Sequence, residues 1–157
     1  MPQRNAFAFP RWSAFDKKLW SELVTSARKD IVTRQGGMLH GSDRDAGAIE
    51  ASIANARRAG VGDDVTFEER PLGGAMPNGE AGWLVTNPPY GVRVGDSAPL
   101  RNLYEAFGKV LRERFDGWTV AMLSTGGELE SRLHVPLTTA FATRNGGIPV
   151  KLVVGSV

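Results

Sequence analysis

The sequence contains no cysteine and only two histidines among its 157 residues. The absence of cysteine excludes disulfides, thiolate metal sites and a cysteine nucleophile. His40 and His134 lie too far apart in the sequence to suggest a metal site, so we predict that no metal is bound. No run approaches the about 18 apolar residues that span a membrane, and the first residues lack the apolar stretch of a signal peptide. We therefore expect a soluble, cytoplasmic protein with no membrane partner.

Net charge is also nearly absent. Nineteen Lys and Arg side chains oppose 17 Asp and Glu side chains, which leaves +2, and this balance does not by itself indicate a nucleic-acid groove. Apolar residues make up 41% and charged residues 23% of the chain, as in ordinary globular proteins. The length is enough for one domain with its own core. We predict a single domain over residues 1–157.

Hydrophobic periodicity predicts alternating strands and helices. Apolar residues at helical spacing predict helices over residues 16–27, 46–59 and 100–115. Short apolar runs predict strands over residues 38–42, 65–68, 83–86, 119–123, 137–143 and 150–154. Asp45 can cap the second helix, Gly60 can end it, and Asn145-Gly146-Gly147 predicts a tight hairpin between the last two strands. This order predicts an α/β fold with a mostly parallel sheet and one antiparallel pair at its C-terminal edge.

The most informative segment is Asn87-Pro88-Pro89-Tyr90, which follows the predicted strand over residues 83–86 and is closed by Gly91. Two consecutive prolines fix two φ angles near about −65° and remove two N–H donors, so neither a helix nor a central strand continues here. Carbonyl oxygens, one amide and one aromatic ring are thus held at the carboxyl end of a strand, where open α/β sheets bind ligands. Acceptors beside a stacking ring suit a planar base with an exocyclic amino group, so the segment predicts chemistry on a nucleobase. The alternative is an ordinary Pro-Pro turn whose tyrosine only packs.

The same tetrapeptide matches the [Asn/Asp/Ser]-Pro-Pro-[Tyr/Phe] signature of amino-group methyltransferases, and other segments narrow the match. These segments are residues 41–45, 55–61, 111–118 and 145–146. Together they resemble the methyltransferase domain of the RlmL-like, THUMP-associated RNA guanine-N2 methyltransferases, over nearly the whole chain. The resemblance implies a Rossmann-like class I methyltransferase fold, which the C-terminal antiparallel pair also favours. It further implies S-adenosyl-L-methionine (SAM) as the cofactor and RNA, either rRNA or tRNA, as the partner.

The resemblance also implies roles for the four residues of the motif. The side-chain oxygen of Asn87 and the main-chain oxygen of Pro88 accept hydrogen bonds from the target amine, Pro89 completes the rigid corner, and Tyr90 stacks on a flipped or single-stranded base. An aromatic amine is a poor nucleophile because its lone pair is delocalised into the ring. Acceptors on its two hydrogens help it to take the methyl group, by positioning and electrostatic stabilisation. Adenine-N6 methylation of RNA or DNA is the alternative, since the motif serves both reactions.

On the cofactor side the resemblance implies Asp43, Arg44 and Asn87. The two oxygens of the Asp43 carboxylate suit the two ribose hydroxyls of SAM, whereas the structural alternative for Asp43 is a helix cap. For Asp45 the cap is the interpretation that we favour. Arg44 lies against the adenine or, as we favour, is a solvated arginine.

Two parts of the family pattern are missing. Pro71 stands where the family places an aspartate that binds the adenine amine, and Glu68 or Glu69 is the candidate replacement, although Glu69 points to the opposite face from Glu68. The family's Asp-Pro-x-Cys-Gly-Ser-Gly-Thr loop has no counterpart, because Gly36-Gly37 and Gly73-Gly74 lack its flanking residues. We therefore expect a sheet without its first strand and weak or absent SAM binding by these residues alone. A missing N-terminal segment or a THUMP-like RNA-binding module then completes the enzyme, or the chain is an inactive fragment or remnant.

Three further groups have both a structural and a functional interpretation. The aromatic residues between Phe7 and Trp20 form a stacking platform for RNA or, as we favour, face the core. The arginines of the predicted helices contact phosphates or, as we favour, lie on solvated helix faces. These arginines are Arg57, Arg58, Arg112 and Arg114. Residues 124–127 border the pocket or form a turn that leads into a helix.

Overall fold

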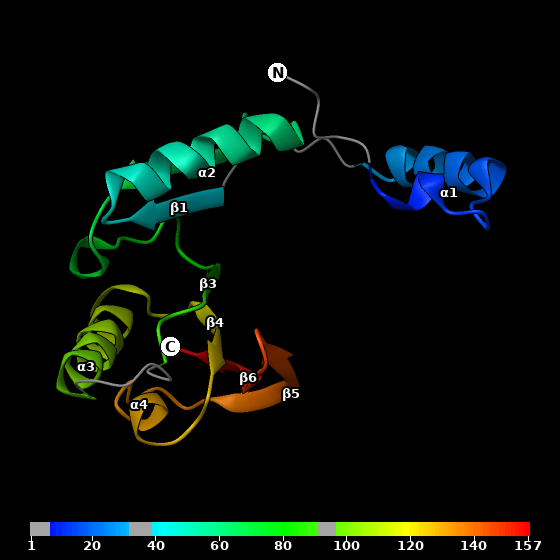
Figure 1. Cartoon of the computed structure of the whole chain (residues 1–157). Helices are drawn as coiled ribbons and strands as arrows, with labels where there is room; N and C mark the ends of the chain where they lie inside the picture. The colour runs from blue at the N-terminus through cyan, green and yellow to red at the C-terminus, as the bar shows by residue number, and fades with distance from the viewer. Residues whose placement is uncertain (1–6, 32–38, 91–96) are drawn as a thin grey trace. The chain divides into compact units, whose positions relative to one another are not determined.

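The computed structural model describes residues 7–31, 39–90 and 97–157. The chain divides into two compact units, Met1–Gly36 and Gly37–Val157. In Figure 1 the first unit carries α1 and the second carries the remaining labelled elements. None of the described helices is both long enough and apolar enough to cross a membrane.

The N-terminal unit consists of a short 3-10 helix, η1 (Phe9–Arg11), and the helix α1 (Lys17–Lys29). The start of α1 follows from its sequence, because the Asp16 carboxylate accepts a hydrogen bond from the Leu19 amide at 2.9 Å and so caps the helix. The predicted first helix is thereby confirmed. No residue of α1 is buried.

Five aromatic rings of this unit pack on one another around Phe9. Its ring centroid lies 4.9 Å from that of Trp20 and 5.1 Å from that of Phe7, and Trp12 and Phe15 also contact it. None of the five is buried, and Phe7 and Trp12 are 62% and 69% exposed. The expectation that this segment faces the core is therefore wrong. One helix and one turn offer too little chain to enclose five rings, so the rings make a cluster that stays at the surface.

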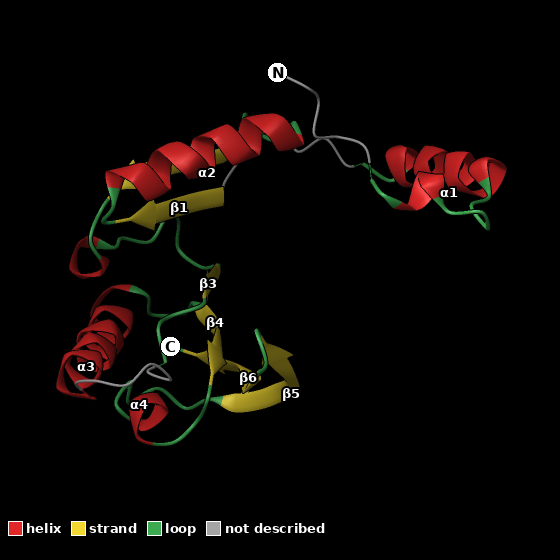
Figure 2. Cartoon of the chain, in the orientation of Figure 1, coloured by secondary structure: helices red, strands yellow, loops and turns green. Residues whose placement is uncertain are grey.

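The second unit begins with a parallel pair of strands, β1 (Leu39–Asp43) and β2 (Val65–Glu69), joined by the helix α2 (Ala46–Ala59). Figure 2 shows α2 lying along this strand pair. Both predicted ends of α2 are confirmed: the Asp45 carboxylate accepts from the Gly47 and Ala48 amides, and Gly60 adopts a left-handed conformation with φ 77°.

The remaining strands form a separate sheet in the order β3-β4-β6-β5. They are β3 (Trp83–Thr86), β4 (Thr119–Ser124), β5 (Thr138–Asn145) and β6 (Ile148–Ser156). The pair β3–β4 is parallel, whereas β6 is antiparallel to both β4 and β5, which confirms the C-terminal hairpin. The expected single sheet is divided into two, because among the described residues no strand lies between β1 and β3 to join them by hydrogen bonds.

The hydrophobic core lies between the helix α3 (Ser97–Arg114) and the four-stranded sheet. Its members are Tyr104, Phe107, Val110, Leu111, Phe115, Val120, Met122, Leu133, Val135 and Val153. Full burial of one large apolar side chain is worth about 1.5–3 kcal/mol. In α2 only Ala56 is buried, and β1 and β2 contain no buried residue. Stabilisation by burial is therefore concentrated around α3.

A short helix, α4 (Glu128–Ser131), whose bounds the sequence did not predict, follows β4. Arg132, just after it, donates hydrogen bonds to Glu128 at 2.8 Å and to Glu105 of α3. Residues 124–127 form the turn that leads into α4, which is one of the two interpretations that the sequence left open.

Candidate active site at the carboxyl end of β3

The segment from Asn87 to Tyr90 continues β3 as irregular backbone, as the two prolines require. Asn87 and Pro89 are exposed, whereas Pro88 and Tyr90 are half-buried. Because β3 and β4 are parallel, this segment stands at the edge of the sheet where α/β folds hold their ligands. The Asn87 amide is therefore open to a ligand while the tyrosine is partly enclosed. Gly91, which closes the motif in the sequence, lies outside the described residues.

The Tyr90 hydroxyl is held by a residue from the far end of the chain. The side-chain Nδ2 of Asn145, at the last position of β5, donates to the Tyr90 Oη at 2.5 Å, and the contact is partly buried. Sequence reasoning assigned Asn145 only to the hairpin turn and to the family resemblance.

Tyr104 lies beneath the same edge, on α3, and is only 1% exposed. Burial, together with the smaller effects of the neighbouring Tyr90 and Glu130, raises the pKa of its hydroxyl to about 12. The two tyrosines of the chain thus lie near each other, one in the core and one at the surface of the site.

The carboxyl end of β4 carries a second set of polar contacts. Ser124, buried at 2% exposure, donates from Oγ to the Glu130 carboxylate at 2.7 Å and accepts from the Gly126 amide at 2.8 Å. These bonds satisfy the serine within the turn before α4. Ser124 is therefore a structural residue that fixes the turn beside the site.

Asp43 ends β1, as predicted, and its side chain is exposed. One oxygen, Oδ1, accepts from the Asp45 amide at 2.9 Å, and the main-chain oxygen of Asp43 accepts from the Arg70 amide at 2.8 Å. The carboxylate is thus oriented by its own turn at the carboxyl end of a parallel strand, and its chemistry fits a vicinal diol such as the ribose of SAM. Asp45 is the helix cap, and Arg44 is exposed.

The two glutamates that are candidates to replace the family's aspartate differ in their surroundings. Glu68 is paired with Arg70, with an Nε–Oε1 distance of 2.7 Å and an Nη2–Oε2 distance of 2.8 Å. Glu69 is exposed and lies opposite Asp43 in the strand register, so the two side chains share a face of the sheet. Pro71 caps the 3-10 helix η2 (Leu72–Gly74). Of the two candidates, Glu69 is the one on the face of Asp43.

The structure does not bring all of the predicted site residues together. Asp43 and Asn87 follow strands of different sheets, and those strands are not paired in the described part of the chain.

Arg114 donates to the main-chain oxygens of Gly73 and Ala75 at 2.9 and 3.0 Å, and Arg112 donates to that of Leu133. Arg112 is exposed, as expected, whereas Arg114 is half-buried and satisfies carbonyls of a neighbouring loop.

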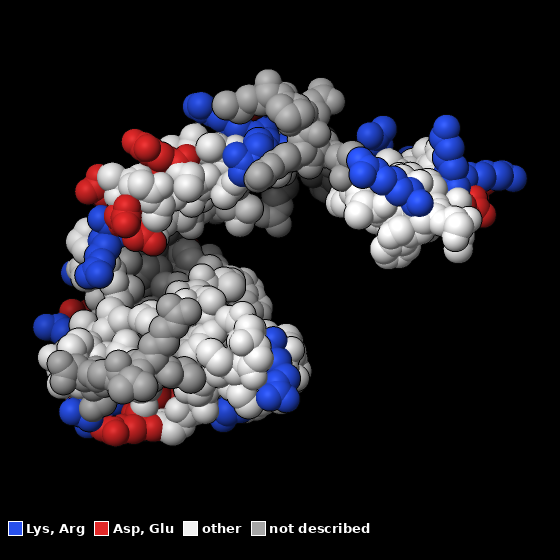
Figure 3. Space-filling model, in the orientation of Figure 1, with Lys and Arg blue, Asp and Glu red and all other residues white. Residues whose placement is uncertain are grey.

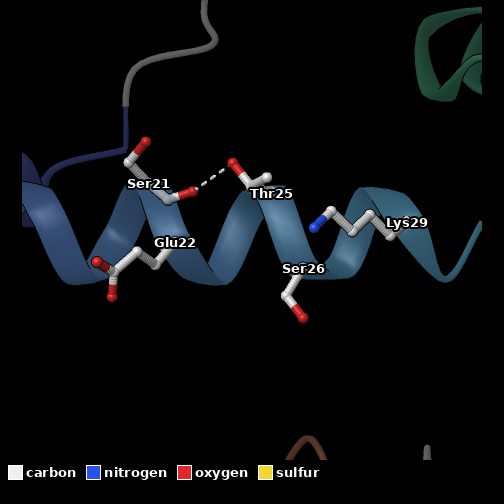
Figure 4. A pocket seen from close by; sticks show the side chains of 5 residues that line it. All are labelled: Ser21, Glu22, Thr25, Ser26 and Lys29. Atoms are coloured by element: carbon white, nitrogen blue, oxygen red, sulfur yellow. Dashed lines mark hydrogen bonds between the residues drawn. The ribbon is translucent and has the colours of Figure 1, made fainter.

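Two hollows on the described surface are lined by residues other than those of the candidate site. One is a shallow depression of about 300 Å³ along the polar side of α1, lined by Ser21, Glu22, Thr25, Ser26 and Lys29 (Figure 4). The other, of about 320 Å³, lies between α2 and β2 and is lined in part by Ile53, Arg57 and Phe67. Neither contains Asp43, Asn87 or Tyr90, so neither is the candidate site. In the ranges that the structure describes, no group of three or more His, Asp or Glu side chains is placed to hold a metal ion.

An α/β fold with an Asn-Pro-Pro-Tyr segment at the end of one parallel strand and an acid at the end of another is the arrangement of a class I methyltransferase domain. The chain belongs to the RMKL-like methyltransferase domain family, which it matches over residues 5–153. The family resemblance and the class of enzyme predicted from the sequence are thereby confirmed.

Individual relatives extend this result. The chain is 33% identical over 146 residues to "Putative RNA methyltransferase slr0064" of Synechocystis sp., covering 93% of this chain. It superimposes with a TM-score of 0.81 and 25% identity on "SMU.472, a putative methyltransferase complexed with SAH", over 98% of its length. A "predicted N6-adenine-specific DNA methylase" from Listeria monocytogenes matches 90% of the chain with a TM-score of 0.67 and 27% identity. These matches confirm the Rossmann-like fold. SAH is the demethylated product of SAM, so the SMU.472 complex agrees with the predicted cofactor.

The chain spans 38% of the curated relative and 40% and 36% of the two solved chains. The activity, the substrate and the partners of the whole protein are therefore the subject of proposals.

Proposed function

We propose that these residues form the target-base half of a SAM-dependent RNA methyltransferase that acts on the exocyclic amine of guanine, N2, in rRNA or tRNA. The observation that carries the proposal is the segment after β3, where an exposed Asn87 amide stands three residues from a Tyr90 ring held by Asn145. A methyl acceptor that is both planar and an amine suits this set of groups.

The chemistry assigned to these residues is positioning. The Asn87 side-chain oxygen and the Pro88 main-chain oxygen accept from the two hydrogens of the amine, which turns its lone pair out of the ring. Tyr90 stacks on the base, and Pro88 and Pro89 keep the acceptors rigid. SAM, when bound, supplies an electrophilic methyl group on a sulfonium centre. Asp43, with Glu69 on the same face, would hold the adenosine part, and the exposed Arg44 would lie against the adenine.

RNA as the partner is supported by the distribution of charge. Residues 1–36 contain seven basic and three acidic side chains, whereas residues 37–157 contain twelve and fourteen. The excess of positive charge is thus confined to the N-terminal unit, on which Figure 3 shows Lys and Arg side chains gathered. The exposed rings of Phe7 and Trp12 lie in the same unit. Basic groups beside exposed rings suit single-stranded RNA.

The choice between guanine and adenine is the finer part of the proposal. The family resemblance, through residues 111–118 and 145–146, favours guanine N2, and the curated relative carries an RNA methyltransferase name. The Listeria monocytogenes neighbour is named as a predicted N6-adenine-specific DNA methylase. The exocyclic amine of adenine, N6, is therefore the second candidate target.

The test incubates the full-length gene product with labelled SAM and, in separate reactions, unmodified rRNA, tRNA and DNA, followed by mass spectrometry of the nucleosides. We expect N2-methylguanosine. Replacing Asn87 by alanine is expected to lower kcat/KM by about 100-fold, the usual cost of one lost group that stabilises developing charge. Asn55→Ala is the matched control, because Asn55 lies exposed on α2 and bonds only within that helix, to Arg58.

The possible results separate the alternatives. N6-methyladenosine in place of N2-methylguanosine would show the adenine enzyme, on RNA or DNA according to the substrate that is labelled. No label in any base would show an inactive remnant of the family. An Asn87→Ala variant as active as Asn55→Ala would remove Asn87 from the site.

A further inference from the structure

The contact between Asn145 and Tyr90 joins two segments that are 55 residues apart. Tyr90 follows β3, which is an edge strand of the four-stranded sheet in the described structure, and Asn145 ends β5, which is the strand at the other edge. A side chain from the opposite end of the sheet order thus reaches the motif that the proposed function uses.

The hairpin holds Asn145 in place by its backbone. Gly146 and Gly147 both have positive φ, 55° and 86°, as a two-residue turn between antiparallel strands requires. Asn145 pairs with Ile148 across the ladder, and the Arg144 Nε donates to the Gly147 oxygen at 3.3 Å. The amide of Asn145 is therefore delivered to Tyr90 from a fixed support.

The bond restrains the far end of the Tyr90 side chain. A tyrosine has two rotatable side-chain torsions, and its ring swings with the first of them. When the Cα is fixed by two preceding prolines and Oη by Asn145, the first torsion is restrained and the ring keeps one position, so less side-chain freedom is lost when a base stacks on it.

We propose that Asn145 is a positioning residue of the methyl-transfer site, and that its amide holds the Tyr90 ring at the position where the target base stacks. This inference rests on the proposed function, because it assumes that Tyr90 meets a base. It adds the β5–β6 hairpin to the elements that determine how the base is held.

A double-mutant cycle of Asn145→Ala and Tyr90→Phe tests the inference in the full-length gene product. Tyr90→Phe keeps the ring and removes only the hydroxyl. We expect each single variant to lower kcat/KM by about fivefold, mainly through a higher KM, as the loss of one net hydrogen bond predicts. The double variant should be no worse than either single variant, because both remove the same bond.

Two further variants separate positioning from a purely structural role. Asn145→Ser keeps a residue that suits a turn but shortens the side chain by one bond. Its kcat/KM should therefore fall by about fivefold, as for Asn145→Ala. This variant keeps the test valid even if Asn145→Ala does not fold. Thr143→Ala is the control on the same strand, where Thr143 is exposed, and should leave kcat/KM unchanged. A role confined to the turn predicts instead that Asn145→Ser is active and that the losses multiply in the double variant.

The results distinguish this inference from the proposed function. Active wild type with coupled losses supports both. Active wild type with independent losses, or with Asn145→Ser unchanged, overturns the positioning role and leaves the methyltransferase intact. Wild type without methyl transfer to any base overturns the proposed function, and the inference that depends on it is then overturned as well.

Discussion

At the scale of single residues, two glycines mark places where backbones approach too closely for any side chain. A Cβ on Gly108, in the middle of α3, would overlap the Leu133 carbonyl oxygen, and a Cβ on Gly155 of β6 would overlap the Pro136 carbonyl oxygen. Backbone atoms cannot move aside as the end of a flexible side chain can. Glycine is therefore required at both positions by space.

Gly108→Ala is expected to destabilise the protein by about 3 kcal/mol, because overpacking against a rigid neighbour outweighs the about 1 kcal/mol that alanine gains in a helix. Urea unfolding followed by circular dichroism measures this difference. Gly73→Ala is the control, since nothing lies within 4 Å of a Cβ there, and it should change the unfolding free energy by less than about 0.5 kcal/mol. Equal stability of the two variants would contradict the close approach of α3 to Leu133.

The chemistry of single residues was predictable where a motif is local in sequence. Asn87 to Tyr90 could be placed because two prolines restrict the backbone wherever they occur. The partner of Tyr90 could not be predicted, because Asn145 reaches it only after the order of four strands is set. The surface position of Phe7 and Trp12 was also missed, since helical spacing shows that a helix has an apolar face but not whether another layer covers it.

At the scale of elements, α2 shows how a helix is specified by its ends. Its described apolar contacts are few, with only Ala56 buried, so its caps contribute a large share of its stability. The Asp45 carboxylate accepts from the Gly47 amide at 2.7 Å and from the Ala48 amide at 3.2 Å. Both amides lie in the first turn, where helix geometry offers them no partner.

Asp45→Ala is therefore expected to cost about 1 kcal/mol in the free energy of unfolding, whereas Asp45→Asn, which keeps the acceptor oxygen, should cost less. Chemical denaturation of the two variants provides the measurement. Asp63→Ala removes an exposed carboxylate after the same helix and controls for the loss of charge. If Asp63→Ala destabilised the protein as much as Asp45→Ala, the effect would be one of net charge rather than capping.

Element positions followed closely from the sequence where caps or proline fix them, as at α2 and β3. The bounds of the short α4 could not be predicted, because four residues give too little periodicity to recognise. The division into two sheets was also outside the reach of local pattern, since strand pairing is a property of distant segments. Among the described residues β1 and β3 are not paired with each other.

At the scale of the whole molecule, that division leaves apolar side chains of edge strands in solvent. Trp83 and Val85 on β3 are 63% and 72% exposed, and Leu39 on β1 is 55% exposed. Unpaired strand edges with apolar side chains favour association with another strand. The stability of the second unit consequently rests on the cluster around α3, in which Tyr104 is one of the largest fully buried side chains.

The buried hydroxyl of Tyr104 links this stability to pH. Its pKa in the folded protein is raised to about 12, from 10.0 in the absence of burial. Above pH 10 the unfolded chain releases this proton while the folded chain retains it, so the unfolding free energy falls with rising pH. The contribution is complete below pH 10 and is lost towards pH 12, with a slope of at most about 1.4 kcal/mol per pH unit.

Tyr104→Phe removes the titrating group but keeps the ring in the core. Unfolding free energies of wild type and variant are measured from pH 9 to pH 12. Their difference should be constant between pH 9 and pH 10. Towards pH 12 the wild type should lose more stability than the variant. Lys and Arg side chains titrate in both proteins and cancel in the difference. Because the chain contains only two tyrosines, the phenolate absorbance of Tyr104→Phe reports Tyr90 alone. Subtracting this absorbance from that of wild type gives the titration of Tyr104. A difference in stability that stays flat up to pH 12 would mean that Tyr104 ionises as readily in the folded chain as in the unfolded one, and that the hydroxyl is not enclosed between α3 and the site.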